Sequence, residues 1–429
     1  MQNPEYGRSI PLPKILRNYW IVTLLLSIIA LGTKLIIIRW SSLPAPYRFF
    51  IFPRYLLFID LRCFESRFQF FHTPHFFLRT PAQGLIFMYP APAALLYQFF
   101  YLFRSYNHYS KLYLAIVTIA IALVTAAFYK TLLEHKVSKL SAAAFITVSV
   151  ACSYPLMVNT FLANMEIFIG LLIGVGFYCF LTGRYMWAAT CFGIATSIKI
   201  FPFIFIALFL GKKQYKIMAY FIALAAVITV FSLWLVSGSV VDSWHGIQDG
   251  LAFFADAYTL DQHPMAIAID HSLFALFTGS FDMFRIHYPT KPTLQAVMHW
   301  YLRLTAVSGI ALYFLRIRLL PVLNQILCFC TIAILFTPAS HDYTIMHLYV
   351  PFGMLALLTI DATQRGVKIP GLTPLFVLFL IAFVPTNEFI VHANQINGQI
   401  KALALIGILY VALKHPFVAP EQPSIYAPA

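Results

Sequence analysis

The chain has 429 residues, of which 61% are hydrophobic and 10% are charged, and its mean hydropathy is +0.80. This composition excludes a soluble globular domain and indicates an integral membrane protein. The formal net charge of +14 would favour a nucleic-acid partner in a soluble protein. Lysine and arginine also gather in the cytoplasmic loops of membrane proteins, so we expect no nucleic acid among the partners.

The first apolar run, at about 20–38, is long enough to span a membrane and lacks a small-residue cleavage site. We expect it to be a retained first span with a cytoplasmic N-terminus. The remaining apolar runs lie at about 85–103, 111–131, 141–157, 164–182, 186–210, 215–236, 294–315, 320–337, 344–360, 371–386 and 399–413. They predict an all-α, polytopic integral membrane protein of about 11–13 membrane helices, in a single domain covering residues 1–429.

Basic and polar connections alternate between these runs. We expect the basic ones to be cytoplasmic, namely Lys130/Lys136/Lys139, Arg184, Lys212/Lys213/Lys216, Arg316/Arg318 and Arg365/Lys368. The polar stretches should face the other side, at about 40–84, 157–166, 237–293, 338–343 and 387–398. The two longest stretches are predicted to form outer loops with short amphipathic helices. We therefore expect a multi-pass protein of the cell membrane with its polar site on the extracytoplasmic face.

Counting the crossings raises two conflicts with this arrangement. If 85–103 and 111–131 both spanned, the loop at 157–166 would lie on the cytoplasmic side. The run at 186–210 begins and ends at basic connections and has Lys199 and Pro202 near its middle. We therefore predict two half-helices, 186–199 and 201–210, that meet near the outer face, and one full crossing in 85–131. Broken helices at membrane depth are tolerated where they line a polar cavity.

The cysteines and histidines give no sign of a metal site. The cysteines fall mostly inside apolar runs, with neither disulfide-framework nor zinc spacing, and we interpret them as packing residues. The histidines do not show a metal-ligand pattern such as HExxH. We therefore expect neither a metal nor a cofactor.

Asp60 is the strongest candidate for chemistry. It lies in an aromatic segment directly outside the first span, where a partly dry carboxylate can act as a base if its pKa is raised towards the working pH. The other interpretation is an ion pair with Arg62 or Arg67 that anchors a surface helix. Both arginines could also bind phosphate, because guanidinium groups bind phosphate bidentately, or they could anchor lipid headgroups without chemistry.

Lys199 is a lone cation deep in an apolar run, and intramembrane charges usually mark function. We expect it to hold an anionic headgroup; the alternative is a side chain that extends to the interface. Glu166 could cap a helix N-terminus or bind sugar hydroxyls. His341 and Asp342, with His347 downstream, form a compact polar group that could bind sugar or hold two spans together. His271 is a weak candidate by itself.

Together these motifs resemble the GT-C class of membrane glycosyltransferases. They are most similar to the polyprenyl-phosphate-dependent alpha-mannosyltransferase family that includes the bacterial phosphatidylinositol-mannoside mannosyltransferase. The resemblance rests on Asp60 in the first outer loop, Phe87-Met-Tyr89-Pro90-Ala-Pro92, Asn164-Met-Glu166, Lys199-Ile-Phe-Pro202, Asp270-His271-Ser272-Leu273 and Thr337-Pro338-Ala-Ser340-His341-Asp342. The family pattern has asparagine and glutamine where this chain has Asp270 and His271, which suggests a different sugar or acceptor.

The resemblance implies a GT-C-like fold and inverting transfer of a hexose, mannose as first choice, from a polyprenyl-phosphate sugar. The acceptor is expected to be a lipid or glycolipid at the extracytoplasmic face, and the lipid-linked donor is a co-substrate. Asp60 would be the catalytic base. The expected substrate-binding residues are Arg62, Arg67, Asn164, Glu166, Lys199, His271, His341 and Asp342.

Two other functions fit some of the same features. A transporter or flippase of lipid-linked sugars would share the intramembrane lysine, the broken helices and the polar outer loops. Such proteins often carry inverted repeats and a midplane site. We find no repeat, and the polar residues gather towards one face, which favours an enzyme. A non-catalytic scaffold of an envelope assembly would tolerate changes at Asp60 and Lys199.

Overall fold

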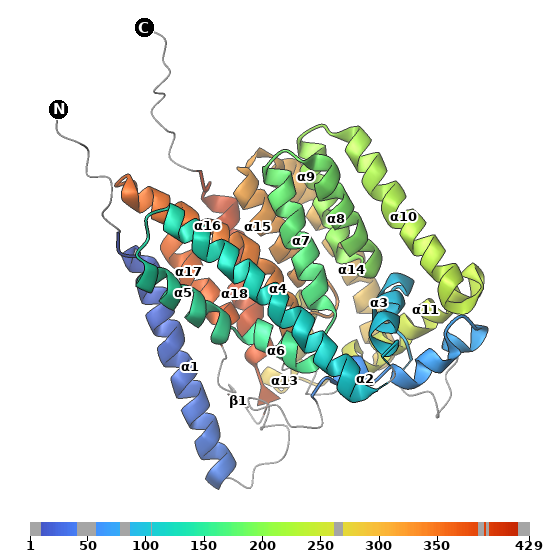
Figure 1. Cartoon of the computed structure of the whole chain (residues 1–429). Coiled ribbons are helices and arrows are strands. Elements are labelled where there is room, and N and C mark those ends of the chain that lie inside the picture. Colours follow the sequence, from blue (N-terminus) through green and yellow to red (C-terminus); the bar gives the residue numbers. More distant parts are fainter. Residues whose placement is uncertain are drawn as a thin grey trace, which may run out of the picture.

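The computed structural model describes residues 10–40, 57–77, 86–103, 105–260, 269–384, 390–391 and 394–418. The regular secondary structure of the described chain is helical apart from two short antiparallel strands, β1 (Ile390–Val391) and β2 (Asn394–Gln395). The prediction of an all-α protein is confirmed. Figure 1 shows the helices side by side, with β1 and α13 at the lower side.

The helices are, in chain order, α1 (Lys14–Trp40), α2 (Ile59–Arg62), η3 (Glu65–Phe70), η4 (Pro74–Phe77), α3 (Ala91–Tyr101), α4 (Tyr106–Glu134), α5 (Lys139–Ala151), α6 (Tyr154–Leu162), α7 (Glu166–Leu181), α8 (Tyr185–Ile198), η6 (Phe201–Phe205), α9 (Ile206–Gly211), α10 (Tyr215–Ser237), α11 (Val240–Phe254), η7 (Ala255–Thr259), α13 (Leu273–Met283), α14 (Lys291–Leu315), η8 (Ile317–Leu319), α15 (Val322–Leu335), η9 (Asp342–Leu348), α16 (Tyr349–Gln364), α17 (Leu372–Phe383) and α18 (Asn397–Lys414).

Length and hydropathy identify membrane-spanning candidates among these helices. Four segments of the described chain are long and apolar enough to cross a membrane: Lys14–Gly32 of α1, α4, α10, and η9 with α16 (Asp342–Gln364). The α5–α6 pair, bent by 52°, adds a fifth if it is one broken span. Five other apolar segments fold as shorter helices, so these criteria support four or five of the expected 11–13 spans. The chain is a polytopic membrane protein.

The break in the run at 186–210 is confirmed. Helix α8 ends at Ile198, and Lys199 has an extended backbone (φ −141°, ψ 139°). A 3₁₀ turn with Pro202 near its start leads into α9. The region 85–131 contains one long helix, α4, and the 11-residue α3, as predicted from the crossing count.

The connections give the bundle a polarity. Basic residues follow the C-terminal ends of α4, α7, α9 and α16, at Lys136, Arg184, Lys212 and Arg365. The N-terminal ends of α7 and α16 lie at the opposite side, near α2 and α6. In Figure 1 the ends of α7, α9 and α16 that precede the basic residues lie along the upper side.

Two apolar cores support the fold. The larger core joins α1, α5, α7 to α9 and α15 to α18. The second core is rich in aromatic side chains and joins α2, η3 and η4 to α3, α4 and α11. Within the larger core, α7 and α8 approach closely at Gly176, where a Cβ atom would lie 2.4 Å from the Phe192 ring. Ordinary Cβ contacts are not that short, so an alanine here would force the Phe192 ring or the two helices to shift.

We predict opposite effects of two glycine-to-alanine substitutions. At Gly32, where nothing lies within 4 Å of the added Cβ atom, alanine should leave stability unchanged or raise it, because it favours helix. At Gly176 alanine should lower the free energy of unfolding by about 1–3 kcal/mol, because it overpacks the contact with Phe192. Thermal unfolding of the purified variants in detergent measures both, and equal midpoints would contradict this account of the α7–α8 contact.

Candidate functional site

The segment that carries Asp60 is fixed against two helices. Phe58, which precedes α2, has a left-handed backbone (φ 57°, ψ 32°), an uncommon conformation for a residue with a bulky side chain. Its amide donates to the Phe161 carbonyl of α6 at 2.8 Å, and the Tyr101 hydroxyl of α3 donates to the Leu61 carbonyl. These contacts hold the half-buried Asp60 at one position beside the end of α6.

Asn164 joins Asp60 to the start of α7. Its Nδ2 atom donates to Asp60 Oδ2 at 2.6 Å, and its Oδ1 atom accepts from the Glu166 amide at 2.9 Å. Burial raises the pKa of Asp60 to about 6, although the hydrogen bond from Asn164 and the charge of Lys199 both lower it. Asp60 is therefore a weak acid that is largely ionised at neutral pH and held by a buried amide.

Glu166, Lys199 and His347 form one buried ionic group. Lys199 makes an ion pair with Glu166, and His347 Nε2 lies 2.5 Å from Glu166 Oε1 and donates to it. The side chains of Glu166 and His347 are buried, whereas that of Lys199 is 17% exposed. The Lys199 Nζ atom also lies 5.6 Å from the Tyr89 ring centre and 5.2 Å from that of Tyr343. The carboxylate holds the ammonium in place while part of Lys199 stays accessible.

His341 lies near this group. Its Nδ1 atom is 3.2 Å from the Tyr343 hydroxyl, and its buried Nε2 atom has no hydrogen-bond partner within the part of the chain that the structure describes. Burial, with a smaller effect from Lys199, lowers the pKa of His341 to about 4, so the imidazole is neutral at physiological pH. A neutral imidazole can offer Nε2–H to an oxygen atom of a substrate.

The segment at 270–272 is joined to the segment at 340–344. Asp270 Oδ1 accepts from the Ser272 and Ser340 amides, both at 2.9 Å. His271 Nε2 lies 3.1 Å from Ser340 Oγ and 3.2 Å from Thr344 Oγ1. The side chain of His271 is fully buried. These contacts fix the loop around His341 and favour a supporting role for His271.

Lys401 was missed by the sequence analysis. It lies in the first turns of α18, and its Nζ atom is 2.5 Å from Asp342 Oδ1; both side chains are buried. The Tyr154 ring of α6 covers the ammonium at 4.4 Å. The available signal was a lone lysine at the beginning of the apolar run 399–413, a weaker form of the signal that identified Lys199 in the middle of its run. The Asp342 carboxylate therefore forms an ion pair within the protein, with Lys401 as its partner.

The two arginines proposed from the sequence lie in different surroundings. Arg62 is exposed, with its guanidinium 5.0 Å from the Tyr106 ring centre. Arg67 is fully buried, and its Nη1 atom donates to the Phe76 carbonyl at 2.7 Å, which links η3 to η4. Arg67 therefore supports the Asp60 segment from within its aromatic core. In the described residues no group of three or more His, Cys, Asp or Glu side chains could hold a metal ion.

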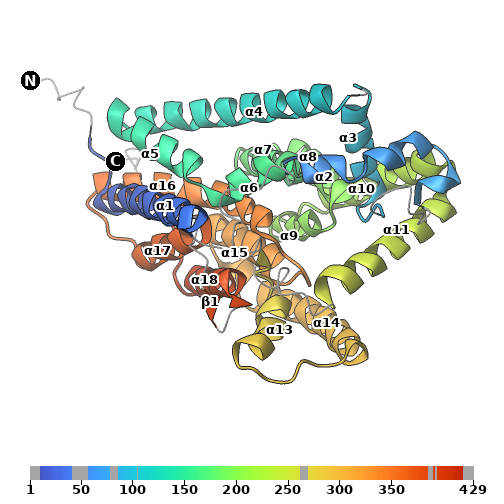
Figure 2. The same ribbon diagram turned by 90° about the horizontal axis from the view of Figure 1, so that it is seen from below.

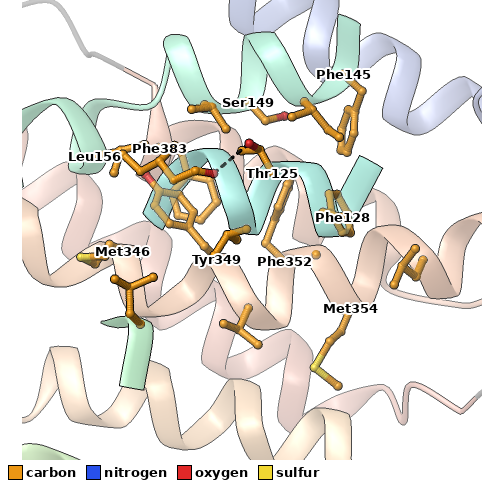
Figure 3. A pocket seen from close by; sticks show the side chains of 18 of the residues that line it. Thr125, Phe128, Phe145, Ser149, Leu156, Met346, Tyr349, Phe352, Met354 and Phe383 are labelled. Atoms are coloured by element: carbon orange, nitrogen blue, oxygen red, sulfur yellow. Dashed lines mark hydrogen bonds between the residues drawn. The ribbon is translucent and has the colours of Figure 1, made fainter. Parts of the chain in front are cut away.

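Two apolar cavities begin beside the ionic group. The first, of about 350 Å³, is bordered by α4, α5, α7 and α16, and Ile167 and Met346 line it next to Glu166 and His347. Figure 3 shows the aromatic side chains of Phe128, Phe145 and Phe352 around it. The second, of about 630 Å³, lies between the η6–α9 segment, α14 and α15 and starts at Ile200, directly after Lys199. Both could hold hydrocarbon chains.

Comparison with known families gives a match over the middle of the chain. The model of glycosyltransferase family 87 matches residues 87–338, more than half of the chain. Neither the curated proteins nor the solved structures contain a match. Asn164, Glu166 and Lys199 lie inside the matched region, whereas Asp60 and Lys401 lie outside it.

We predict that Lys401→Met will be strongly destabilising, because it leaves Asp342 buried without its cation. Removing one partner of a buried ion pair costs about 3–5 kcal/mol. The double variant Lys401→Met/Asp342→Asn should be more stable than Lys401→Met alone, because no uncompensated charge remains. Unfolding of the purified proteins in detergent gives the coupling energy. Additive effects of the two substitutions would show that the pair is not energetically coupled.

Proposed function

Since the chain belongs to glycosyltransferase family 87, we propose that it transfers a hexose, mannose as first choice, from a polyprenyl-phosphate sugar to a hydroxyl group of a lipid or glycolipid. The observation that carries this proposal is the arrangement of Asp60 and Lys199 in one polar cluster, at the ends of apolar helices and beside two apolar cavities. A base and a phosphate-binding cation are the two groups that this reaction needs.

Asp60 is proposed as the catalytic base. As the acceptor oxygen bonds to C1 of the sugar, its proton passes to the Asp60 carboxylate, and the bond between C1 and the phosphate oxygen breaks. Attack opposite the leaving phosphate inverts the configuration at C1. A carboxylate with a pKa of about 6 is ionised at neutral pH yet basic enough to share the proton in the transition state.

Lys199 is proposed to stabilise the phosphate that leaves with the polyprenyl chain. Its ammonium is already held by Glu166 and by the rings of Tyr89 and Tyr343, so little reorganisation is needed when charge develops. The Nε2–H group of His341 can donate to a second phosphate oxygen. Glu166 is fully buried, so we assign it to holding Lys199 rather than to the sugar hydroxyls.

The remaining residues expected to bind substrate are assigned supporting roles. Asn164 positions Asp60 through a direct hydrogen bond. Asp342, held by Lys401, and His271 fix the segment that carries His341. Arg67 holds η3 against η4, and Arg62 is exposed at the surface, where a lipid headgroup could reach it. This assignment leaves Asp60, Lys199 and His341 as the side chains that touch the reacting groups.

The polarity of the helices supports an extracytoplasmic site. The ends of α7, α9 and α16 that precede basic residues would lie at the cytoplasmic face by the positive-inside rule. Glu166 and Asp342 lie at the first residues of α7 and η9, and therefore at the opposite face. The apolar cavities extend from that face along the helices, so a polyprenyl chain could remain at membrane depth while its phosphate reaches Lys199.

The direct test is a transfer assay with the full chain in nanodiscs, radiolabelled polyprenyl-phosphate mannose and a membrane lipid extract. The proposal predicts a labelled lipid product with the unaltered protein and none with Asp60→Asn, a substitution of nearly the same shape. Transfer by both proteins would refute the base assignment. Absence of transfer with mannose and with other hexose donors would refute the transferase and favour transport of lipid-linked sugars.

We predict a pH dependence that reports on Asp60. Because only the ionised carboxylate accepts the proton, the transfer rate should fall about tenfold per pH unit well below its pKa of about 6 and level off above it. Asn164→Ala removes a hydrogen bond that lowers this pKa, so the midpoint should move to higher pH. Rates measured from pH 5 to 8 test this, and an unchanged midpoint in Asn164→Ala would contradict it.

We further predict that Lys199→Met will lower kcat by about 10²–10³, because it removes a preorganised charge at the leaving group. Glu166→Gln keeps Lys199 but removes the carboxylate that holds it, and it should lower kcat less than Lys199→Met does. Steady-state kinetics with varied donor and, separately, with varied acceptor distinguish effects on kcat from effects on each KM. If Glu166→Gln changed only the KM for the acceptor sugar, Glu166 would be a sugar ligand, and the positioning role would be wrong.

A further inference from the structure

Helix α11 presents three different surfaces around its axis. Its buried side consists of Ser243, Gly246, Ile247 and Gly250. At 100° per residue, the next sector carries the exposed apolar side chains of Val240, Trp244 and Leu251. The sector beyond it carries the exposed polar residues Asp242, His245 and Asp249. A helix with protein, apolar and polar sectors is typical of the membrane interface.

The buried side of α11 lies directly on the segment that carries Asp60. A Cβ atom at Gly246 would lie 2.2 Å from Phe77 Cβ of η4, and one at Gly250 would lie 2.3 Å from the Phe87 carbonyl oxygen. Two glycines four residues apart therefore let the helix backbone touch this segment. The Phe87 ring packs edge-on against Phe64 at 5.2 Å, only four residues from Asp60. The path from α11 to the proposed base consists of packed aromatic rings.

The beginning of α11 is fixed at the end of a span. Helix α10, which is long and apolar enough to cross the membrane, ends at Ser237, and Gly238 (φ 78°) turns the chain. Ser243 Oγ then donates to the Leu233 carbonyl of α10 at 2.7 Å. Figure 2 shows α11 leading away from this end of α10. The helix thus starts at the level where a span leaves the hydrocarbon.

Two exposed tryptophans also indicate that the end of α10 and the start of α11 lie at the membrane–water interface. Trp234, near the end of α10, is 48% exposed, and Trp244 on α11 is 52% exposed. Tryptophan is enriched at membrane–water interfaces, because its ring is apolar and its N–H group bonds to water or headgroups. Exposing the apolar sector of α11 to water would be unfavourable, whereas phospholipid acyl chains would cover it.

We propose that Val240, Trp244 and Leu251 bind the phospholipids of the outer leaflet, and that this contact holds the Asp60 segment in its working position through Gly246 and Gly250. The lipid surface is then a binding partner of α11. The consequence for catalysis rests on the proposed function, whereas the lipid contact and the mechanical coupling do not. The bilayer, and not only the protein, sets the position of the base.

The lipid contact is tested by fluorescence quenching in nanodiscs whose phospholipids carry bromine near the headgroup end of the acyl chains. The emission of Trp244 is the difference between the spectra of the unaltered protein and of Trp244→Phe. It should be strongly quenched by the brominated lipids. The matched control is the double variant Trp244→Phe/His245→Trp, which places the tryptophan in the polar sector. Its additional emission, relative to Trp244→Phe, should be quenched much less. Equal quenching at the two positions, or none at Trp244, would overturn the lipid contact.

The coupling is tested by hydrogen exchange of peptides from residues 57–77, measured by mass spectrometry in nanodiscs. Trp244→Asp places a charge against lipid, so exchange in this segment should rise about tenfold, and transfer activity should fall in parallel. Trp244→Leu keeps the apolar contact and His245→Asp alters only the polar sector; both should behave like the unaltered protein. Unchanged exchange in Trp244→Asp would overturn the coupling.

Absence of transfer activity in every variant and in the unaltered protein would count against the proposed function. The exchange result would still test the coupling.

Discussion

The need to neutralise one buried carboxylate organises the polar end of this protein. Glu166 is fully buried at the first residue of α7, and an isolated charge in such a place costs several kcal/mol. Lys199 and His347 satisfy it from two other parts of the chain. The break after α8 and the start of η9 must therefore meet at the beginning of α7. That meeting point leaves Lys199 partly accessible and close enough for its charge to act on Asp60. The ion pair that stabilises the fold thus also holds the cation that the proposed reaction uses.

A second buried pair repeats this arrangement at the neighbouring helix ends. Lys401 of α18 is neutralised by Asp342 at the first residue of η9. One segment, 342–347, thus contributes to both ionic groups, and His341 directly precedes it. Buried ion pairs add little net stability when compared with well-packed apolar residues, but each is costly to break. Two of them at the same end of the bundle restrict how the helices can be arranged there, and so restrict the geometry around the proposed reaction centre.

Several of these features could be predicted from the sequence because they depend on local pattern. The hydropathy pattern predicted a helical membrane protein. Lys199 and Pro202, in the middle of an apolar run, predicted the break between α8 and α9. The resemblance drew attention to Asn164, whose side chain does contact Asp60. Pairings across the chain could not be derived, because no spacing rule joins Glu166 to His347 or Asp342 to Lys401. Burial could not be derived from the sequence either, so the sequence did not show that Arg67 is fully buried and bonded to the Phe76 carbonyl.

The account's central claim is that the ammonium of Lys199, held by Glu166, binds the phosphate of a polyprenyl lipid. The most direct measurement is the equilibrium binding of radiolabelled polyprenyl monophosphate and of the uncharged polyprenol to the protein in nanodiscs, with Lys199→Met beside the unaltered chain. The account predicts that the substitution weakens monophosphate binding at least about tenfold, the loss of roughly one charge-assisted contact, and leaves polyprenol binding unchanged. Equal weakening of both ligands, or of neither, would contradict it.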